Sequence, residues 1–145
     1  MDSITVRPYE SADLPLVVAL AEQLGYPVAE DEVFGHMSAI EQDPNHVVVV
    51  AADDLGKAVG WVHVFLARRV FMPPRADLGG LVVDEAARGK SIGEKLMVAA
   101  EEWARQMGCT RIIVRSNVVR EEAHRFYHRL GYEISKRQAV LGKAL

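Results

Sequence analysis

The sequence predicts an α/β fold in which helices flank a mixed β-sheet, and three observations support this prediction. Segments with the alternating or β-branched pattern of strands are interleaved with segments of helical periodicity. An early pair of strands around a short polar turn favours antiparallel pairing, whereas a later strand, helix and strand in succession favour a parallel crossover. No repeat, low-complexity tract or flexible linker interrupts the 145 residues, so we expect a single domain over residues 1–145.

The first half of the chain is predicted to contain a strand, two helices and a hairpin. Residues 3–9 alternate like a strand, and Ser11 is the expected N-cap of the first helix. Residues 30–41 place apolar side chains on one side of a second helix. Two β-branched runs, residues 46–52 and 58–66, flank the polar turn sequence Asp-Asp-Leu-Gly-Lys, which predicts an antiparallel hairpin.

The second half begins with a loop at Pro73 and Pro74, which precedes a buried strand over residues 76–83. The remaining elements are predicted to be a helix over residues 92–107, a strand over 111–115, a helix through 123–130, and one or two closing strands over 132–143.

Composition and charge exclude several classes of protein. The chain carries 17 Lys and Arg against 20 Asp and Glu, so its net charge of −3 and its 50% hydrophobic content are typical of a globular protein. Residues 1–87 hold 5 basic and 14 acidic groups, whereas residues 88–145 hold 12 basic and 6 acidic groups. The basic residues occur singly and without interleaved aromatic residues, so we expect no nucleic-acid partner.

The sequence also indicates a cytoplasmic protein without a membrane partner. Its single cysteine, Cys109, excludes an intrachain disulfide, and its glycine neighbour at a helix end favours a small buried side chain over a nucleophile. The longest apolar run, residues 47–52, is far shorter than the ~18 residues that a membrane span requires. The start MDSITVRPYE lacks the apolar core of a secretory signal.

The segment Leu81–Leu96 (LVVDEAARGKSIGEKL) carries the clearest chemical signal. A buried strand ends in an acidic turn, and Arg88-Gly89-Lys90-Ser91-Ile92-Gly93 then opens a helix. Free backbone N–H groups at such a helix start, together with two cations, can bind a pyrophosphate. Taken alone, the pattern also fits an ordinary turn and helix start, and it matches neither the P-loop nor the three-glycine dinucleotide spacing.

Two blocks of the sequence resemble the GNAT superfamily of N-acetyltransferases. Arg88, Ser91 and Gly93 occupy the fixed positions of its Arg/Gln-x-x-Gly-x-Gly/Ala signature, with a serine in place of the usual middle glycine. The later block, Ser116-Asn117 followed by Ala-His-Arg-Phe-Tyr and Leu-Gly-Tyr, is similar to the family's Asn…Phe-Tyr…Leu-Gly block. The C-terminal block is especially similar to that of small bacterial enzymes that acetylate aminoalkylphosphonates.

This resemblance implies a splayed sheet, flanked by about four helices, that opens beside residues 76–83 to bind acetyl-CoA as co-substrate. Because its Cβ restricts the backbone, Ser91 could weaken cofactor binding. The implied cofactor-binding residues are Leu81, Val82 and Val83 on the strand, Arg88, Gly89, Lys90, Ser91, Ile92 and Gly93 in the following turn, and Asn117 and Phe126 in the later block.

The resemblance further implies direct attack by a primary amine in a ternary complex, with Tyr127 as general acid toward the departing thiolate. Gly79 and Gly80 provide no side chain where related enzymes often carry a glutamate, so Asp77 is the candidate base, acting through a water molecule. His63 is an alternative base, and solvent could also remove the proton. His124 and His128 have the spacing of two metal ligands but lack a third, so we expect no metal.

Three functions remain open on the sequence. We expect an acetyltransferase acting on a small-molecule amine, with a protein lysine or N-terminus as another possible acceptor. A non-catalytic acyl-CoA sensor or partner module is the alternative, favoured by Ser91 and by the missing strand glutamate. The apolar segment 138–145 and the hairpin 47–66 also predict a homodimer, because exposed apolar edges require cover.

Overall fold

The computed structural model describes residues 3–89, 91–116 and 121–145. Its contacts divide the chain into two compact units, Met1–Val114 and Arg115–Leu145, which are described separately. The first unit contains the sheet and three of the helices, and the second contains one further helix. Within the described residues, no helix is long and apolar enough to cross a membrane.

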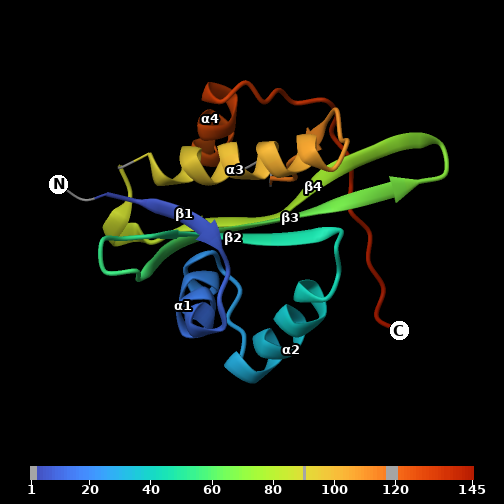
Figure 1. Cartoon of the computed structure of the whole chain (residues 1–145). Helices are drawn as coiled ribbons and strands as arrows, with labels where there is room; N and C mark the ends of the chain where they lie inside the picture. Colours follow the sequence, from blue (N-terminus) through green and yellow to red (C-terminus); the bar gives the residue numbers. More distant parts are fainter. Residues whose placement is uncertain (1–2, 90, 117–120) are drawn as a thin grey trace. The chain divides into compact units, whose positions relative to one another are not determined.

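A mixed five-stranded sheet forms the centre of the first unit (Figure 1), which confirms the predicted fold class. Strands β1 to β4 pair antiparallel with their chain neighbours, and β5 pairs parallel with β4. The strands follow one another across the sheet in the order β1 (Thr5–Pro8), β2 (His46–Ala52), β3 (Ala58–Arg69), β4 (Met72–Val83) and β5 (Ile112–Ile113).

Helices cover both faces of this sheet (Figure 1), so each strand alternates between two apolar layers. Helices α1 (Leu14–Gln23) and α2 (Glu30–Glu41) pack on one face, and α3 (Ile92–Gln106) packs on the other. We call these the α1–α2 face and the α3 face. The α3 face holds the main core, in which Ile92, Leu96 and Ala100 pack against Val62 and Val64 of β3.

The first helix begins differently from the sequence-based prediction. Ser11 is not its N-cap, because it lies in a short 3₁₀ turn, η1 (Ser11–Asp13), that precedes α1. The Asp13 carboxylate accepts the backbone N–H of Glu10 at 2.8 Å and two guanidinium bonds from Arg7 at 2.8 Å each. This buried ion pair therefore sets the start of the helical segment.

The prediction of a loop at Pro73 and Pro74 was also wrong, since both prolines lie within β4. The pairing between β3 and β4 passes from Met72 directly to Arg75, so neither proline occupies a paired position. A proline has no N–H to donate and holds an extended φ, so it is tolerated where the ladder is interrupted. The strand predicted over residues 111–115 is reduced to Ile112 and Ile113.

The second unit contains α4 (Glu121–Arg129), which agrees with the helix predicted there. Gly131 adopts a φ of 95°, and the N–H of Tyr132 bonds the carbonyl of Tyr127 at 3.0 Å, which closes the helix. The predicted closing strands are absent, because residues 133–145 form neither helix nor strand. This segment is exposed and pairs with no strand within the described residues.

Candidate functional site

The sheet opens beside β4. Parallel pairing between β4 and β5 is confined to Ala76 and Asp77, although β4 continues to Val83. From Leu78 onward, the edge of β4 on that side has no strand partner within the described residues. Backbone N–H and C=O groups on this edge are therefore available to an extended ligand. This is the splayed sheet that was predicted.

A bulge in β4 accompanies the opening. His63 on β3 faces Gly80, while the next residue, Val64, faces Leu78, so Gly79 is an extra residue in the strand. Leu78 and Leu81 consequently both pack toward the α3 face, although they are three residues apart. Because of the bulge, the residues of β4 after Gly79 point to the opposite faces from those that strict alternation would give, at the point where β4 has separated from β5.

Strand β4 leads into the start of α3 through the short turn η2 (Glu85–Ala87). This turn is held by Asp84, whose carboxylate accepts the Ala86 N–H at 3.2 Å, and by Gln23 of α1, whose side-chain oxygen accepts the Glu85 N–H at 3.1 Å. The Gln23 amide also donates to Asp84 at 3.3 Å. Sequence reasoning did not identify Gln23, because 62 residues separate it from Glu85.

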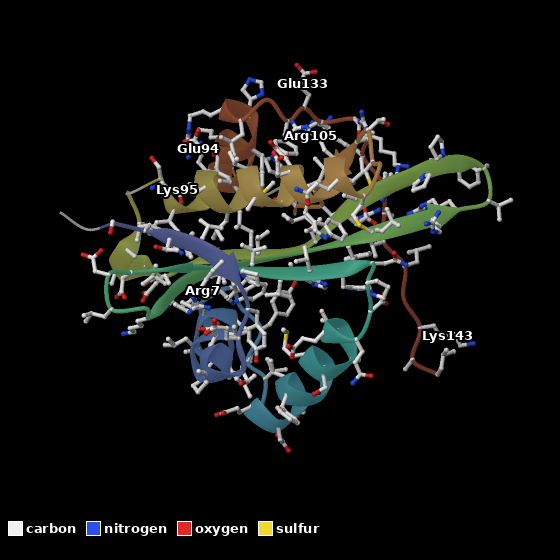
Figure 2. All side chains as sticks on the ribbon, in the orientation of Figure 1. Arg7, Glu94, Lys95, Arg105, Glu133 and Lys143 are labelled. Carbon is white, nitrogen blue, oxygen red and sulfur yellow. The ribbon has the colours of Figure 1, made fainter. Side chains whose placement is uncertain are left out.

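The start of α3 presents free amide groups. Its first intrahelical bond runs from the Lys95 N–H to the Ser91 carbonyl at 3.1 Å, so the N–H groups of Ile92, Gly93 and Glu94 have no acceptor within the helix. No side chain caps them within the described residues. Glu94 and Lys95 mark this end of α3 in Figure 2. Such an end binds anions through its N–H groups and helix dipole.

Ser91 has an unusual backbone conformation. It adopts φ 58° and ψ 25°, and it is the one non-glycine residue with positive φ among those described. This left-handed conformation costs a residue with a Cβ roughly 1–2 kcal/mol, whereas Gly89, at φ 90°, adopts its own positive φ without that cost. The loop therefore has the backbone course that glycines favour, and Ser91 follows it under strain.

The predicted cofactor-binding residues divide into groups. Leu81, Val82 and Val83 end β4, and η2 connects them to Arg88, Gly89, Ser91, Ile92 and Gly93 at the start of α3. Lys90 and Asn117 lie outside the described residues. Phe126 lies on α4 in the second unit.

Tyr127 also lies on α4, within an aromatic group of the second unit. Its ring centroid is 5.0 Å from that of Phe126 and 5.8 Å from that of Tyr132, both in edge-to-face arrangement. These contacts fix the ring within its own unit.

Several polar and aromatic side chains share the α1–α2 face of β2, β3 and β4. The cross-strand pairs His46 with Phe65, Phe65 with Asp77, and His63 with Gly80 place these residues on one side of the sheet. Nδ1 of His46 and Nε2 of His63 are 2.9 Å apart. Asp77 is only 5% exposed. This face therefore gathers two imidazoles and a buried carboxylate beside the opening of the sheet.

Burial affects the chemistry of two titratable groups, His63 on this face and Cys109 in the core of the α3 face. The pKa of His63 is lowered to about 4, chiefly by burial and also by the nearby His46 ring. Burial also raises the pKa of Cys109, although Arg68 opposes that shift, so this buried thiol is poorly suited to nucleophilic attack. Within the described residues, no group of three or more His, Cys, Asp or Glu side chains could hold a metal ion.

Comparisons with known proteins agree with this architecture. The model of the acetyltransferase (GNAT) family matches residues 13–132. An aminoalkylphosphonate N-acetyltransferase of Salmonella typhimurium is 47% identical over 59 residues, which are 41% of this chain and 38% of that relative. A glucosamine 6-phosphate N-acetyltransferase of Oryza sativa subsp. japonica is 29% identical over 90% of this chain and 82% of that protein.

A solved structure gives the same result for the fold. The crystal structure of an aminoglycoside 6′-N-acetyltransferase from Acinetobacter baumannii aligns with a TM-score of 0.86, at 22% identity, over 99% of both chains.

Proposed function

Because this chain belongs to the acetyltransferase (GNAT) family, we propose that it transfers an acetyl group from acetyl-CoA to a primary amine of a small molecule. The observation that carries the proposal is the continuity of one segment. The unpaired edge of β4 leads through η2 to the free amides at the start of α3. An extended thioester arm and a pyrophosphate joined to it require these two features in this order.

In this proposal, the backbone of Leu81, Val82 and Val83 bonds the pantetheine arm. The N–H groups from Gly89 to Gly93 bind the pyrophosphate, and the exposed Arg88 adds positive charge. Asn117 and Phe126 are proposed to complete the cofactor site.

The proposed reaction occurs in a ternary complex. An uncharged amine attacks the thioester carbonyl, a C–N bond forms, and the C–S bond breaks to release CoA. A backbone N–H near Val83 is proposed to stabilise the developing oxyanion. Tyr127 is proposed to protonate the departing thiolate, and Asp77 or His63 to receive the proton of the amine.

The acceptor is proposed to be a small polar molecule with a primary amine. The names of the relatives support this class, since aminoalkylphosphonates, glucosamine 6-phosphate and aminoglycosides all carry an amine on a small polar framework. The acidic first half of the chain favours a cationic acceptor. A cytoplasmic setting, where acetyl-CoA is available, is part of the proposal.

A thiol-release assay tests this function. The protein is incubated with acetyl-CoA and, separately, an aminoalkylphosphonate, glucosamine 6-phosphate, an aminoglycoside and a lysine peptide, and mass spectrometry identifies the acetylated product. We expect amine-dependent CoA release with at least one small molecule and little with the peptide. Faster turnover of the peptide would instead identify a protein acetyltransferase.

A non-catalytic acyl-CoA-binding module is the alternative, and the strained Ser91 and the bare Gly79 and Gly80 favour it. Calorimetry separates the two functions, because a sensor would bind acetyl-CoA but release no thiol with any amine. We further propose that two copies of the chain form a homodimer through the exposed apolar segment of residues 138–145. The hairpin of β2 and β3, which was also expected to contribute, has strand partners on both sides and offers no free edge within the described residues.

A further inference from the structure

A line of polar groups extends from the β4 bulge toward solvent. Nε2 of His63 lies 2.9 Å from Nδ1 of His46, and Nε2 of His46 lies 3.6 Å from a carboxylate oxygen of Asp43. Exposure increases from His46 to Asp43, because the side chain of His46 is 26% exposed and that of Asp43 is 46% exposed. All three residues belong to the first unit.

The inner end of this line takes the place of a β4 side chain. A Cβ added to Gly79 would collide with Nδ1 of His63 and would come within 3.0 Å of two further ring carbons. The imidazole of β3 therefore occupies the space that a side chain at position 79 would require. Within the described residues, the ring of His63 has one hydrogen bond, the one to His46, which leaves Nδ1 without a partner.

His63 is better placed than Asp77 relative to the opening of the sheet. Asp77 pairs with Ile113, so it lies where β4 and β5 are still joined. The cross-strand neighbour of His63 is Gly80, beyond the last residue that pairs with β5. An acyl group bound along the free edge of β4 would therefore lie closer to His63 than to Asp77, which lies where the two strands are still paired.

The charge of Asp43 favours one pair of tautomers for the two rings. The Asp43 carboxylate favours a proton on Nε2 of His46, which leaves Nδ1 of His46 as an acceptor. Nε2 of His63 must then donate to that acceptor. Nδ1 of His63 consequently presents a lone pair over Gly79, as a proton acceptor requires.

We propose that His63 accepts the proton of the attacking amine and passes a proton to His46 beside Asp43, an inference that rests on the proposed acetyl transfer. When the amine nitrogen bonds the carbonyl carbon, it becomes positively charged and must lose a proton before the C–S bond breaks. That proton goes to Nδ1 of His63, while the proton on Nε2 of His63 moves to Nδ1 of His46. His63 ends neutral and His46 carries the charge.

This transfer reconciles a partly buried base with the electrostatics of the site. His63 does not have to retain a charge in its partly buried position, where its pKa is lowered to about 4. The positive charge instead resides on His46, next to the negative Asp43. Arg75 and Asp77 of β4 are the other charged groups placed on this face by strand alternation.

Replacement of His63 by alanine tests the proposal with acetyl-CoA and the amine that the wild-type protein turns over. We expect kcat to fall by roughly 10²–10³-fold, within the usual range for a general base, while acetyl-CoA affinity stays unchanged. Added imidazole should restore at least part of kcat, because it can enter the space beside Gly79. A His36→Ala variant, which alters an exposed histidine of α2, should behave like wild type and show no imidazole effect.

His46→Phe provides the second arm, since it retains an aromatic ring against Phe65 but removes the proton acceptor. We expect kcat to fall roughly tenfold or more and the acidic limb of the pH profile to shift, with little change in KM. Imidazole should not rescue this variant as well as it rescues His63→Ala. Should His63→Ala fail to fold, a wild-type kcat and pH profile for His46→Phe would overturn the relay.

The outcomes distinguish this inference from the proposed function. Wild-type protein that binds acetyl-CoA but releases no thiol with any amine would overturn both. Wild-type turnover together with a folded His63→Ala variant of unchanged kcat would overturn the relay alone. Loss of activity that imidazole does not restore, combined with a large loss in Asp77→Asn, would assign the proton to Asp77 instead.

Discussion

Ser91 shows how one side chain can oppose the conformation of a loop. Its backbone has a φ of 58°, which a residue with a Cβ rarely adopts, and its hydroxyl makes no helix-capping bond that would offset the strain. We expect Ser91→Gly to raise the free energy of unfolding by about 1 kcal/mol, because the relief of strain exceeds the added flexibility of glycine in the unfolded chain. Acetyl-CoA affinity should be maintained or improve, as measured by calorimetry.

Ser38→Gly is a matched control for that prediction. Ser38 lies inside α2 and its hydroxyl bonds the Phe34 carbonyl at 2.9 Å, so the same exchange should destabilise the protein by about 0.5 kcal/mol. Thermal unfolding of both variants should therefore give shifts of opposite sign. A large loss of cofactor affinity in Ser91→Gly would instead show that the hydroxyl contacts the ligand.

Gly89 and Gly56 form a pair that separates backbone strain from ligand contact. Both have positive φ, 90° and 81°, and a Cβ at either position would meet no atom within 4 Å. Valine at either site should cost similar stability, about 1–2 kcal/mol. Only Gly89→Val should weaken acetyl-CoA binding, by roughly 10–100-fold, because it disturbs amides proposed to bond the pyrophosphate. Equal affinity of the two variants in calorimetry would contradict that site.

Tyr127→Phe tests the proposed acid while it preserves the ring contacts with Phe126 and Tyr132. If the hydroxyl protonates the thiolate, kcat should fall by roughly 10²-fold, the lower end for acid–base catalysis, because a thiolate is already a fair leaving group. Acetyl-CoA affinity should change little. A wild-type rate across the whole pH profile would show that solvent protonates CoA.

At the scale of elements, the Arg7–Asp13 pair connects β1 to the start of α1. Figure 2 labels Arg7 on the α1–α2 face of the sheet. Asp13 is only 4% exposed, so Arg7→Met would leave a buried carboxylate without its main partner. We expect a loss of about 3 kcal/mol, the lower end for a broken buried pair, as measured by urea unfolding. Asp13→Leu in the same chain should recover part of that loss.

The same pair predicts how stability depends on pH. The hydrogen bonds from Arg7 are the main cause that lowers the pKa of Asp13 in the folded protein. The stability that they provide is therefore present above the unfolded pKa of about 3.9, and it is lost as the pH falls through the lower folded pKa. Arg7→Met should flatten this acid limb, and an unchanged limb between pH 6 and 2 would contradict the assignment.

Elements with strong local signals could be predicted from the sequence. The helix at Glu30–Glu41 and the hairpin of β2 and β3 follow from periodicity and turn composition within about twenty residues. The glycine preference of the loop before α3 was also evident, and Ser91 has a positive φ of 58°, which glycine adopts more readily. The prediction of closing strands over residues 132–143 was wrong, because an apolar pattern does not by itself provide a neighbouring strand to pair with.

The candidate base could not be chosen from the sequence, because its environment depends on register. His46 and His63 become neighbours only when Val48 pairs with His63, and the ring reaches Gly79 only because of a bulge in the next strand. Sequence reasoning could name His63 and Asp77 but could not detect Asp43 or His46 beside them. Long-range pairing, rather than local propensity, determines the site.

At the scale of the whole molecule, the exposed apolar side chains of residues 133–145 bear on whether the chain forms a dimer. Val140 and Leu141 are 86% and 91% exposed, and the segment forms no strand within the described residues. Adjacent exposed apolar side chains favour association, and a second copy of the chain carries the same apolar segment. Light scattering should therefore give about 32 kDa, twice the 16.0 kDa of the chain.

Leu141→Asp identifies the surface involved, since a charge there should return the mass to that of one chain. Tyr26→Asp, at an exposed position between α1 and α2, should leave the dimer intact. Because dimer formation depends on concentration, the wild-type mass should fall on dilution, and the midpoint of that fall gives the dissociation constant. A wild-type protein that remains at one chain's mass at every concentration would rule out the dimer and leave the apolar segment exposed in solution.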